Sequence, residues 1–254
     1  MTAPANVDPA PPTGPRAWPR PLLAWRGIQA LIADPDDTTA VFQVIGACAG
    51  NSVARNWKRM QADSTGRRIL AEGRLLLPVL ENRARLEQLP AGSLGRRYAA
   101  FMCNEALSAD GLVDASDAGR IQPGAQAPSQ SEPGVVLGSR LRDAHDLWHV
   151  VTGYGRDLVG ETALLAFTYA QTGVRGIGVI ALVGLYRLWR AGVPDAVHTI
   201  TGGYRRGRHA AFLAAADWEH LLAEPLDRVR EQLGVEPAGD YPVVRSDGAP
   251  ALPH

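Results

Sequence analysis

Apolar residues recur at helical spacing along most of the chain, whereas Val, Ile and Thr seldom form the alternating runs that indicate strands. The spacing predicts an all-α protein with a single multi-helix domain. The predicted helices are Leu22–Ala33, Thr38–Ala49, Val53–Gln61, Val79–Leu89, Leu94–Leu107, Arg140–Val151, Leu158–Gln171, Ile177–Arg190, Asp195–Arg208, Ala210–Leu222 and Pro225–Leu233. Gly153, Gly173 and Gly234 favour the left-handed backbone that commonly closes a helix. Asp63 and Ser93 are suited to cap the start of one.

Proline-rich segments interrupt this pattern in three places. Residues 1–21 are predicted to be a disordered extension, and residues 236–254 a flexible tail. The segment 121–138 is predicted to be a long surface loop before the next helix, because connections beyond about 12 to 15 residues are usually functional or disordered. The helical domain is therefore expected to cover residues 22–235.

Composition and charge exclude several functional classes. The 254 residues include 26 basic and 26 acidic ones, and this balance argues against a nucleic-acid-binding protein, which is usually strongly basic. Cys48 and Cys103 are too few for a disulfide framework, so a reducing compartment is expected. The most apolar stretch, Gly176 to Tyr186, has eleven residues. A spanning helix needs roughly 18 or more.

The most informative residues are chelating side chains, in which His145-Asp146-x-x-His149 is followed after eleven residues by Glu161. On a helix, His145 and His149 lie about 40° apart around the axis and one turn along it, so that their imidazoles converge. Asp146 lies about 60° from His149 and can flank the same point. A turn closed by Gly153 would allow the next helix to return with Glu161 near its start.

The histidines are also expected to point into the protein. The inward stripe of an amphipathic helix is formed by Leu141, Ala144, His145, Trp148 and Thr152. A buried pair of imidazoles beside two carboxylates costs several kcal/mol unless something compensates, and a divalent cation would do so. The alternative is that both histidines are ordinary core residues. The spacing favours metal binding by His145, Asp146, His149 and Glu161.

Two other metal-dependent classes share parts of the pattern. In the zinc-peptidase motif the residue after the first histidine is Glu, the general base. Here it is Asp146, which would hold a base about an ångström further from the metal-bound water. A hydrolase therefore stays as a weaker alternative. A nucleotide phosphohydrolase built on a His-Asp doublet needs an earlier histidine, and His145 is the first in the chain, which excludes that class.

At these residues the sequence resembles the Coq-four family of ubiquinone (coenzyme Q) biosynthesis proteins, whose hallmark is H-D-x-x-H, eleven residues, then E. The resemblance runs from about Leu22 to Val235. The other matching elements are Met60, Asp63, Gly66, Arg67 and Leu70, then Leu89, Pro90, Gly92, Gly95 and Tyr98, then Leu147, Gly153, Tyr154, Gln171, Thr172 and Gly173, and finally Trp218, Glu219, Glu224, Pro225 and Leu226. The segment 121–138 and both proline-rich ends depart from the family pattern.

The resemblance implies an all-helical protein, peripheral to a membrane, that holds a divalent cation, usually taken to be zinc. It also implies a role in ubiquinone biosynthesis, with oxidative decarboxylation of a polyprenylated hydroxybenzoate-type precursor as the reaction. In such a site the metal would polarise the ring carboxylate, and Asp146 or Glu161 would handle a proton. Two histidines and a carboxylate also suit iron or manganese, which serve an oxygen-dependent step better than redox-silent zinc.

A polyprenyl substrate needs a long apolar surface, and the predicted helix Ile177–Arg190 is apolar nearly all round. The candidate lipid-binding residues are Ile177, Ile180, Leu182, Leu185 and Trp189. The helix would line a lipid groove or enter the bilayer surface, with Arg175, Arg187 and Arg190 meeting lipid phosphates. The alternative is a central core helix.

Other arginines lie close to the chelating motif in the sequence. Arg140, Arg142 and Arg156 would attract an anionic substrate, or they are ordinary cap partners on a solvated face. Three functional hypotheses remain at this point: a metal-dependent decarboxylase, a non-catalytic lipid-binding scaffold with a structural or ligand-fixing metal, and the weaker hydrolase.

The expected partners follow from the resemblance. They are the polyprenylated aromatic precursor, other ubiquinone biosynthesis proteins and a membrane surface, but no nucleic acid, and a homodimer is compatible with the sequence. The first twenty residues lack both a signal peptide and a basic amphipathic presequence. A cytoplasmic location, peripheral to the inner (cytoplasmic) membrane, is therefore expected.

Overall fold

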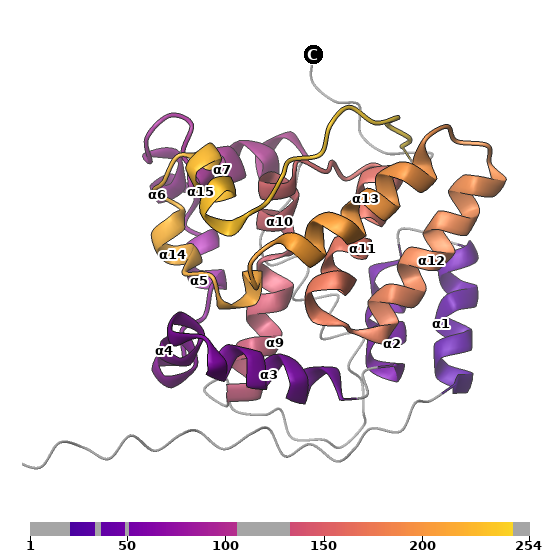
Figure 1. Ribbon diagram of the computed structural model, residues 1–254, viewed down its shortest axis with the longest axis horizontal. Coiled ribbons are helices and arrows are strands. Elements are labelled where there is room, and N and C mark those ends of the chain that lie inside the picture. The colour runs from indigo at the N-terminus through magenta and orange to yellow at the C-terminus, as the bar shows by residue number, and fades with distance from the viewer. Residues whose placement is uncertain (1–20, 34–36, 49–50, 106–132, 246–254) are drawn as a thin grey trace, which may run out of the picture.

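The computed structural model describes residues 21–33, 37–48, 51–105 and 133–245, and within them helices are joined by short turns (Figure 1). The helices are α1 (Pro21–Ala33), α2 (Thr38–Ala47), α3 (Ser52–Ala62), α4 (Ser64–Glu72), α5 (Leu77–Leu80), α6 (Arg83–Glu87), α7 (Leu94–Asn104), α9 (Pro133–Asp143), α10 (His145–Thr152), α11 (Leu158–Thr172), α12 (Arg175–Arg190), α13 (Ala196–His209), the 3-10 helix η1 (Leu213–Ala215), α14 (Trp218–Leu221) and α15 (Leu226–Leu233). No strand occurs in the described ranges. The prediction of an all-α protein is confirmed.

Helix α11 lies at the centre of the molecule and packs against α12 and α13 (Figure 1). Its contact with α13 is close because α13 presents glycines. A Cβ atom at Gly203 would lie 2.4 Å from the carbonyl oxygen of Ala163, and one at Gly207 would lie 2.5 Å from that of Phe167. Helices α1 and α2 pack on the other side of α12. The backbone of α11 is thus held at close range by its neighbours.

The C-terminal end of α11 is fixed by side chains of α3. Asn56 Nδ2 donates to the carbonyl oxygen of Thr172 at 2.9 Å, and Arg55 donates to that of Gly173 at 2.8 Å. Arg59 donates to the carbonyl oxygen of Gln171, the residue directly before Thr172. These donors satisfy carbonyl groups that a helix end leaves unpaired, and two of them bring positive charge to the negative end of the helix dipole. Gly173 closes the helix with φ 60°, as predicted.

Several helix boundaries differ from the prediction. The helix expected over Val79–Leu89 is two short helices, because the Asn82 side chain accepts from the Arg85 backbone and starts a new one. Helix α4 is missing from the predicted set, although its cap Asp63 is where we expected one. The helix expected over Ala210–Leu222 is only η1 and α14, separated by extended backbone at Ala216.

Parts of the predicted loop and of the predicted flexible tail are ordered in the structure. Helix α9 begins at Pro133, so the last six residues of the expected loop 121–138 are helical. A proline suits the first helical position, since its missing N–H would be unpaired there. Residues 236–245, expected to belong to a flexible tail, are hydrogen-bonded to the helical body, for example from Ala238 N to Thr152 O. Residues 1–20, 121–132 and 246–254 of the expected extension, loop and tail lie outside the described residues.

One buried ion pair ties α9 to α14. The Arg140 side chain is 1% exposed, and it donates to both carboxylate oxygens of Glu219, at 2.6 and 3.1 Å. The same guanidinium also donates to the carbonyl oxygens of Arg74 and Ala216. A buried charge needs this many partners, because water no longer solvates it. The pair therefore anchors the helix that leads directly into the chelating motif.

Replacing Arg140 with Met is expected to lower the free energy of unfolding by about 3 kcal/mol or more, because it leaves Glu219 without its buried partner. Urea unfolding followed by circular dichroism measures the change. As a control, Arg83→Met removes an exposed pair with Glu87 and should cost less than about 0.5 kcal/mol. Equal losses in the two variants would contradict the importance given to the buried pair.

Candidate metal centre

A helix–turn–helix unit, α10 and α11 with the turn between them, carries the chelating residues. Helix α10 starts at His145, directly after the single non-helical residue Ala144 that separates it from α9. It ends at Gly153, which has φ 76° and closes the helix as predicted. Asp157 then caps α11 by accepting from two backbone N–H groups of its first turn. Glu161 lies in that first turn and so faces back towards α10.

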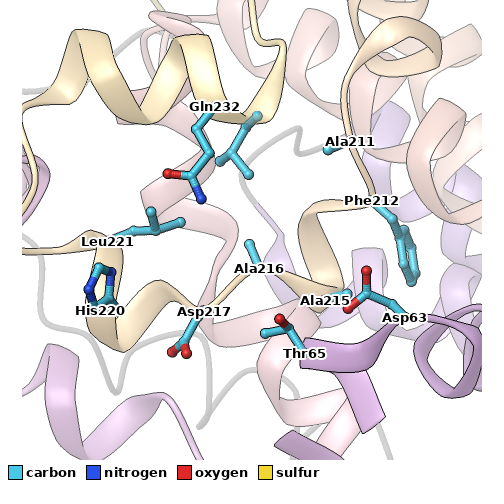
Figure 2. Close-up of a pocket in the computed structure, with 11 residues that line it drawn as sticks. Asp63, Thr65, Ala211, Phe212, Ala215, Ala216, Asp217, His220, Leu221 and Gln232 are labelled. Atoms are coloured by element: carbon cyan, nitrogen blue, oxygen red, sulfur yellow. The ribbon is translucent and has the colours of Figure 1, made fainter. Parts of the chain in front are cut away.

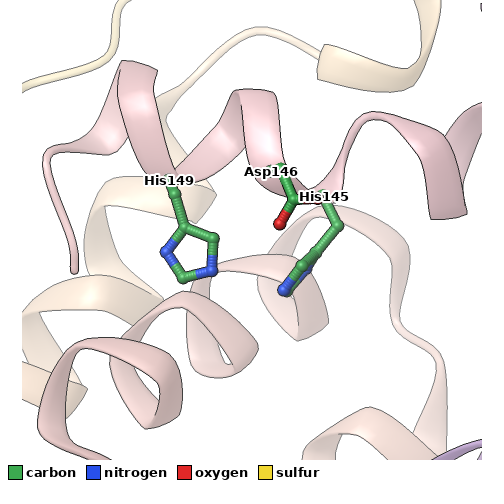
Figure 3. A group of neighbouring side chains, drawn as sticks. All are labelled: His145, Asp146 and His149. Carbon is green, nitrogen blue, oxygen red and sulfur yellow. The ribbon is translucent and has the colours of Figure 1, made fainter. Parts of the chain in front are cut away.

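The structure brings the four predicted residues together. The Glu161 carboxylate lies between the two imidazoles, with Oε1 3.2 Å from His145 Nε2 and Oε2 3.0 Å from His149 Nε2. The ligand atoms of His145, Asp146 and His149 all lie within 4.8 Å of one another. Figure 3 shows these three side chains extending from the same side of α10 towards a common region. The four residues thus lie together as their spacing predicts, and their binding of a metal stays a prediction.

The centre is closed on one side and open on the other. The His149 side chain is fully buried, and Asp146 is also buried. In contrast, the side chain of His145 is 21% exposed and that of Glu161 is 34% exposed. A cation held here would therefore be reached by solvent or substrate past His145 and Glu161.

The ring of His149 is oriented by two contacts outside the motif. Its Nδ1 lies 2.9 Å from the carbonyl oxygen of Tyr154. A carbonyl can only accept, so Nδ1 carries a hydrogen, and Nε2 is the ring nitrogen that faces the centre. The ring also stacks on Phe101 of α7, with centroids 5.5 Å apart. Neither contact is predictable from the sequence, because Phe101 is distant in the chain and a backbone carbonyl has no sequence signature.

Charge and burial shift the pKa values of the centre in opposite directions. Burial alone would lower the pKa of the His145 imidazole, but the charge and hydrogen bond of Glu161 outweigh it and raise that pKa. For the Glu161 carboxyl, burial alone would raise the pKa, but the two imidazoles hold that pKa well below its usual range. Glu161 is thus an anion, as a metal ligand must be.

The donor set fits a divalent cation. His149 Nε2 is buried, and its contact with Glu161 lacks the geometry of a hydrogen bond, so the structure leaves this atom without a hydrogen-bond partner. Two imidazole nitrogens and one or two carboxylates are ligands that zinc, iron and manganese accept. The exposed side leaves room for a further ligand. The residues present can therefore hold a metal ion.

The three arginines near the motif have different roles in the structure. Arg140 is buried in its pair with Glu219, and Arg142 Nε donates to Asp143 at 2.7 Å. Arg156 is exposed in the turn between α10 and α11, and its charge lowers the pKa of His145 slightly against the larger effect of Glu161. Arg156 is therefore the arginine of this group that faces solvent near the centre.

The five candidate lipid-binding residues of α12 do not share one environment. Ile180 is buried against Leu31, Ala40 and Val44 of α1 and α2, and Ile177 is partly buried. An open apolar hollow of about 320 Å³ is lined by Leu182, Leu185, Tyr186, Trp189 and Val197. Tyr186 and Val197 were not among the candidates, although Tyr186 follows Leu182 by four residues. The hollow combines one exposed face of α12 with the start of α13.

A second hollow lies away from the chelating residues. It has a volume of about 210 Å³ and is bounded by Asp63 and Thr65 at the start of α4, by η1, and by α14 and α15 (Figure 2). Its acidic groups already have partners. Asp63 accepts from Gly66 N, and Asp217 pairs with Arg68 and Arg74. We assign no function to this hollow.

Comparison with known proteins identifies relatives. The family model described as "Coenzyme Q (ubiquinone) biosynthesis protein Coq4" matches residues 17–114 and 135–239. A curated relative from Aspergillus flavus, "Ubiquinone biosynthesis protein coq4, mitochondrial", is 31% identical over 196 residues, which are 73% of this chain and 61% of the relative. The corresponding protein of Rattus norvegicus is 30% identical over 70% of this chain and 64% of its own. The chain thus spans about three fifths of the length of these relatives.

A solved structure has a similar fold. The crystal structure of a putative ubiquinone biosynthesis protein from Nostoc punctiforme is 25% identical, with a TM-score of 0.64, and the match covers 85% of this chain and 96% of that chain. The gap in the family match, residues 115–134, overlaps the segment 121–138 that departs from the family pattern.

The expectation of a cytoplasmic location is contradicted by these comparisons, because the curated relatives are named as mitochondrial proteins. That expectation rested on the composition of the first twenty residues, which does not report reliably on the compartment. Among the described residues, no helix has both the length and the apolar character that crossing a membrane requires.

The affinity of the centre for Zn²⁺ is expected to fall by about tenfold for each pH unit below the pKa of His145, because a proton must leave the imidazole before its nitrogen can bind metal. Since Glu161 raises that pKa, the decline should begin above the ordinary value of 6.5. Competition with a chromophoric chelator across this pH range measures it. His220→Gln, at an exposed histidine of α14, should leave the profile unchanged, and an affinity that stays constant down to about pH 6 would contradict the assignment.

Proposed function

The chain belongs to the Coq4 (Coq-four) family of coenzyme Q (ubiquinone) biosynthesis proteins, and we propose that it is a metal-dependent enzyme that oxidatively decarboxylates a polyprenylated hydroxybenzoate-type precursor. The observation that carries the proposal is the Glu161 carboxylate between His145 and His149, with Asp146 beside them. A half-open centre of this kind suits a substrate group that must reach a cation.

The metal we propose is zinc, with iron and manganese as alternatives that suit the same donors. When bound, it would supply a Lewis acid for the ring carboxylate. His145, His149 and Glu161 would hold it, and Asp146 would complete the set or act as a base. His149 is the best-defined of these ligands, because the Tyr154 carbonyl fixes its tautomer.

The chain's own residues have separate tasks around the substrate. Arg156, exposed beside the open side of the centre, would attract the carboxylate of the precursor and orient it. Glu161 is partly exposed and Asp146 is buried, so Glu161 is placed to exchange a proton with solvent, and Asp146 to keep a proton within the centre. In the overall reaction the bond from the ring to the carboxylate breaks and carbon dioxide leaves, a ring–hydroxyl bond forms with oxygen from water, and the two electrons reduce dioxygen to hydrogen peroxide.

The apolar hollow on α12 would receive the prenyl tail or a lipid surface. Leu182 and Trp189 are 66% and 63% exposed, which is unusual for large apolar side chains. The hollow lies on α12, and α12 packs against α11, the helix that carries Glu161, with Gly184 of α12 against Thr162 of α11. At the edge of the hollow, the Arg190 guanidinium lies over the ring of Tyr186. A cation in this position would meet lipid phosphate.

The same hollow favours a second candidate function, a lipid-binding scaffold for other ubiquinone biosynthesis proteins. In that case the metal would be structural or would fix the ligand's head group, and there would be no turnover. The proposed partners are the same in both cases: the polyprenylated precursor, other proteins of the pathway and a membrane surface. A homodimer stays a prediction.

His149→Ala is expected to abolish both metal retention and product formation while the helical circular dichroism spectrum is kept, because the ligand is lost but its helix remains. Metal analysis of the purified protein is combined with incubation of zinc-, iron- or manganese-loaded samples with a prenylated hydroxybenzoate and dioxygen. His198→Ala, at an exposed position of α13, serves as the control.

The outcomes separate the two candidate functions. Product from metal-loaded wild type and from His198→Ala alone supports the enzyme and identifies its metal. Bound metal and retained lipid without product under any loading would support the scaffold. Full turnover by His149→Ala would contradict the proposed centre.

Leu182→Glu and Trp189→Glu are each expected to release the protein from liposomes at least partly, with little loss of stability, because both side chains are exposed in the described structure. Co-sedimentation with vesicles and a thermal melt measure the two effects. Val53→Glu, at an exposed apolar position of α3, is the matched control. Ile180 is unsuitable for this test, because it is buried against α1 and α2.

A further inference from the structure

The C-terminal segment 235–245, which we call the C-terminal strap, lies across the turn that joins the two helices of the metal centre. Its backbone bonds to that turn at both ends. Ala238 N donates to the carbonyl oxygen of Thr152, and Leu158 N donates to that of Val244, each at 2.6 Å. In Figure 1 the strap is the yellow segment that follows α15. It therefore connects the end of α10 with the start of α11.

The side chain of Tyr241 lies at the middle of this contact. Its hydroxyl accepts from Gly155 N at 2.7 Å and donates to Asp157 Oδ2 at 2.9 Å. The other oxygen of Asp157 accepts from the capped N–H groups of α11 and from Val244 N. One hydroxyl thus joins the turn, the cap of α11 and the strap. The same hydrogen bonds account for the burial of Asp157, which a carboxylate would otherwise resist.

A glycine makes this close approach feasible. A Cβ atom at Gly160 would lie 2.5 Å from the Tyr241 hydroxyl oxygen and 2.4 Å from the Gly155 carbonyl oxygen. Gly160 directly precedes Glu161. The strap consequently touches α11 one residue from the metal ligand, at a position where any side chain would displace it.

The turn under the strap is hydrogen-bonded to both His149 and Glu161, two of the proposed metal ligands. The Tyr154 carbonyl that accepts from His149 Nδ1 belongs to this turn. The Glu161 backbone N–H donates to the carbonyl oxygen of Asp157 at 2.8 Å. A displacement of residues 154–157 would therefore move the partner of one ligand and the backbone of the other.

We propose that Tyr241 is a positioning residue of the metal centre, and that its hydroxyl fixes the turn that sets Glu161 against His149. This inference rests on the proposed function, because it concerns affinity for the proposed metal. The family match ends at residue 239, so Tyr241 lies just beyond the matched residues. Tyr241 also lies within residues 236–254, which the sequence predicts to be a flexible tail.

The test is Tyr241→Phe, which removes the hydroxyl and keeps the ring beside Tyr154. The dissociation constant for Zn²⁺, measured by chelator competition, is expected to rise about 10- to 100-fold, the usual effect of losing an outer-shell partner. Tyr169→Phe, which removes a hydroxyl from α11 two turns beyond Glu161, is the matched control and should leave the constant unchanged. Thermal melts of all metal-free proteins report any loss of stability.

A double-variant cycle separates positioning from general stability. In a Glu161→Gln background, Tyr241→Phe should change the dissociation constant much less, because the ligand that the strap positions is already weakened. In the metal-free protein, amide hydrogen exchange should become faster at residues 155–161 in Tyr241→Phe and not in Tyr169→Phe. Gly160→Ala should reproduce both effects by displacing the strap.

These measurements distinguish failure of the positioning role of Tyr241 from failure of the proposed function. If wild type binds no metal, both the proposed function and this inference are overturned. If wild type binds metal and Tyr241→Phe binds it equally well, only the positioning role is overturned. An equal loss of affinity in the wild-type and Glu161→Gln backgrounds would also overturn it, because Tyr241 would then act independently of Glu161.

Discussion

The return of α11 alongside α10 is the constraint on which the rest of this structure depends. It places a carboxylate from one helix between two imidazoles of the other, at 3.2 and 3.0 Å. Such a cluster is costly to bury unless every charge has a partner. The surrounding elements hold the cluster in place: the Tyr154 carbonyl orients His149, and the Asp157 side chain caps the start of α11.

The packing around this unit can be understood as support for it. Helix α13 reaches the backbone of α11 through glycines, and α3 satisfies the carbonyls at its far end. The buried pair between Arg140 and Glu219 holds α9, which leads into α10 after one residue. The body of the protein thus fixes α11 as a whole, while the turn under the C-terminal strap fixes its start, where Glu161 lies.

The centre and the apolar hollow lie on neighbouring helices and present different chemistry. The centre offers anions and imidazoles with an open side, whereas the hollow offers aromatic and aliphatic side chains with arginine at its edge. A prenylated aromatic acid has the same two parts, an anionic ring and an apolar tail. The two helices pack against each other, with Gly184 of α12 against Thr162 of α11.

The sequence by itself determined the helical class, the cap and closing residues of several helices, and the proximity of the four candidate metal ligands, because these depend on spacing along one chain. It did not determine that α12 is buried on one side and exposed on the other, since its apolar residues surround the helix. Only the tertiary structure decided which arginine stays exposed near the centre and where the C-terminal strap lies. Arg140 and Tyr241 are identified by partners 79 and 84 residues away, and no local pattern encodes such contacts.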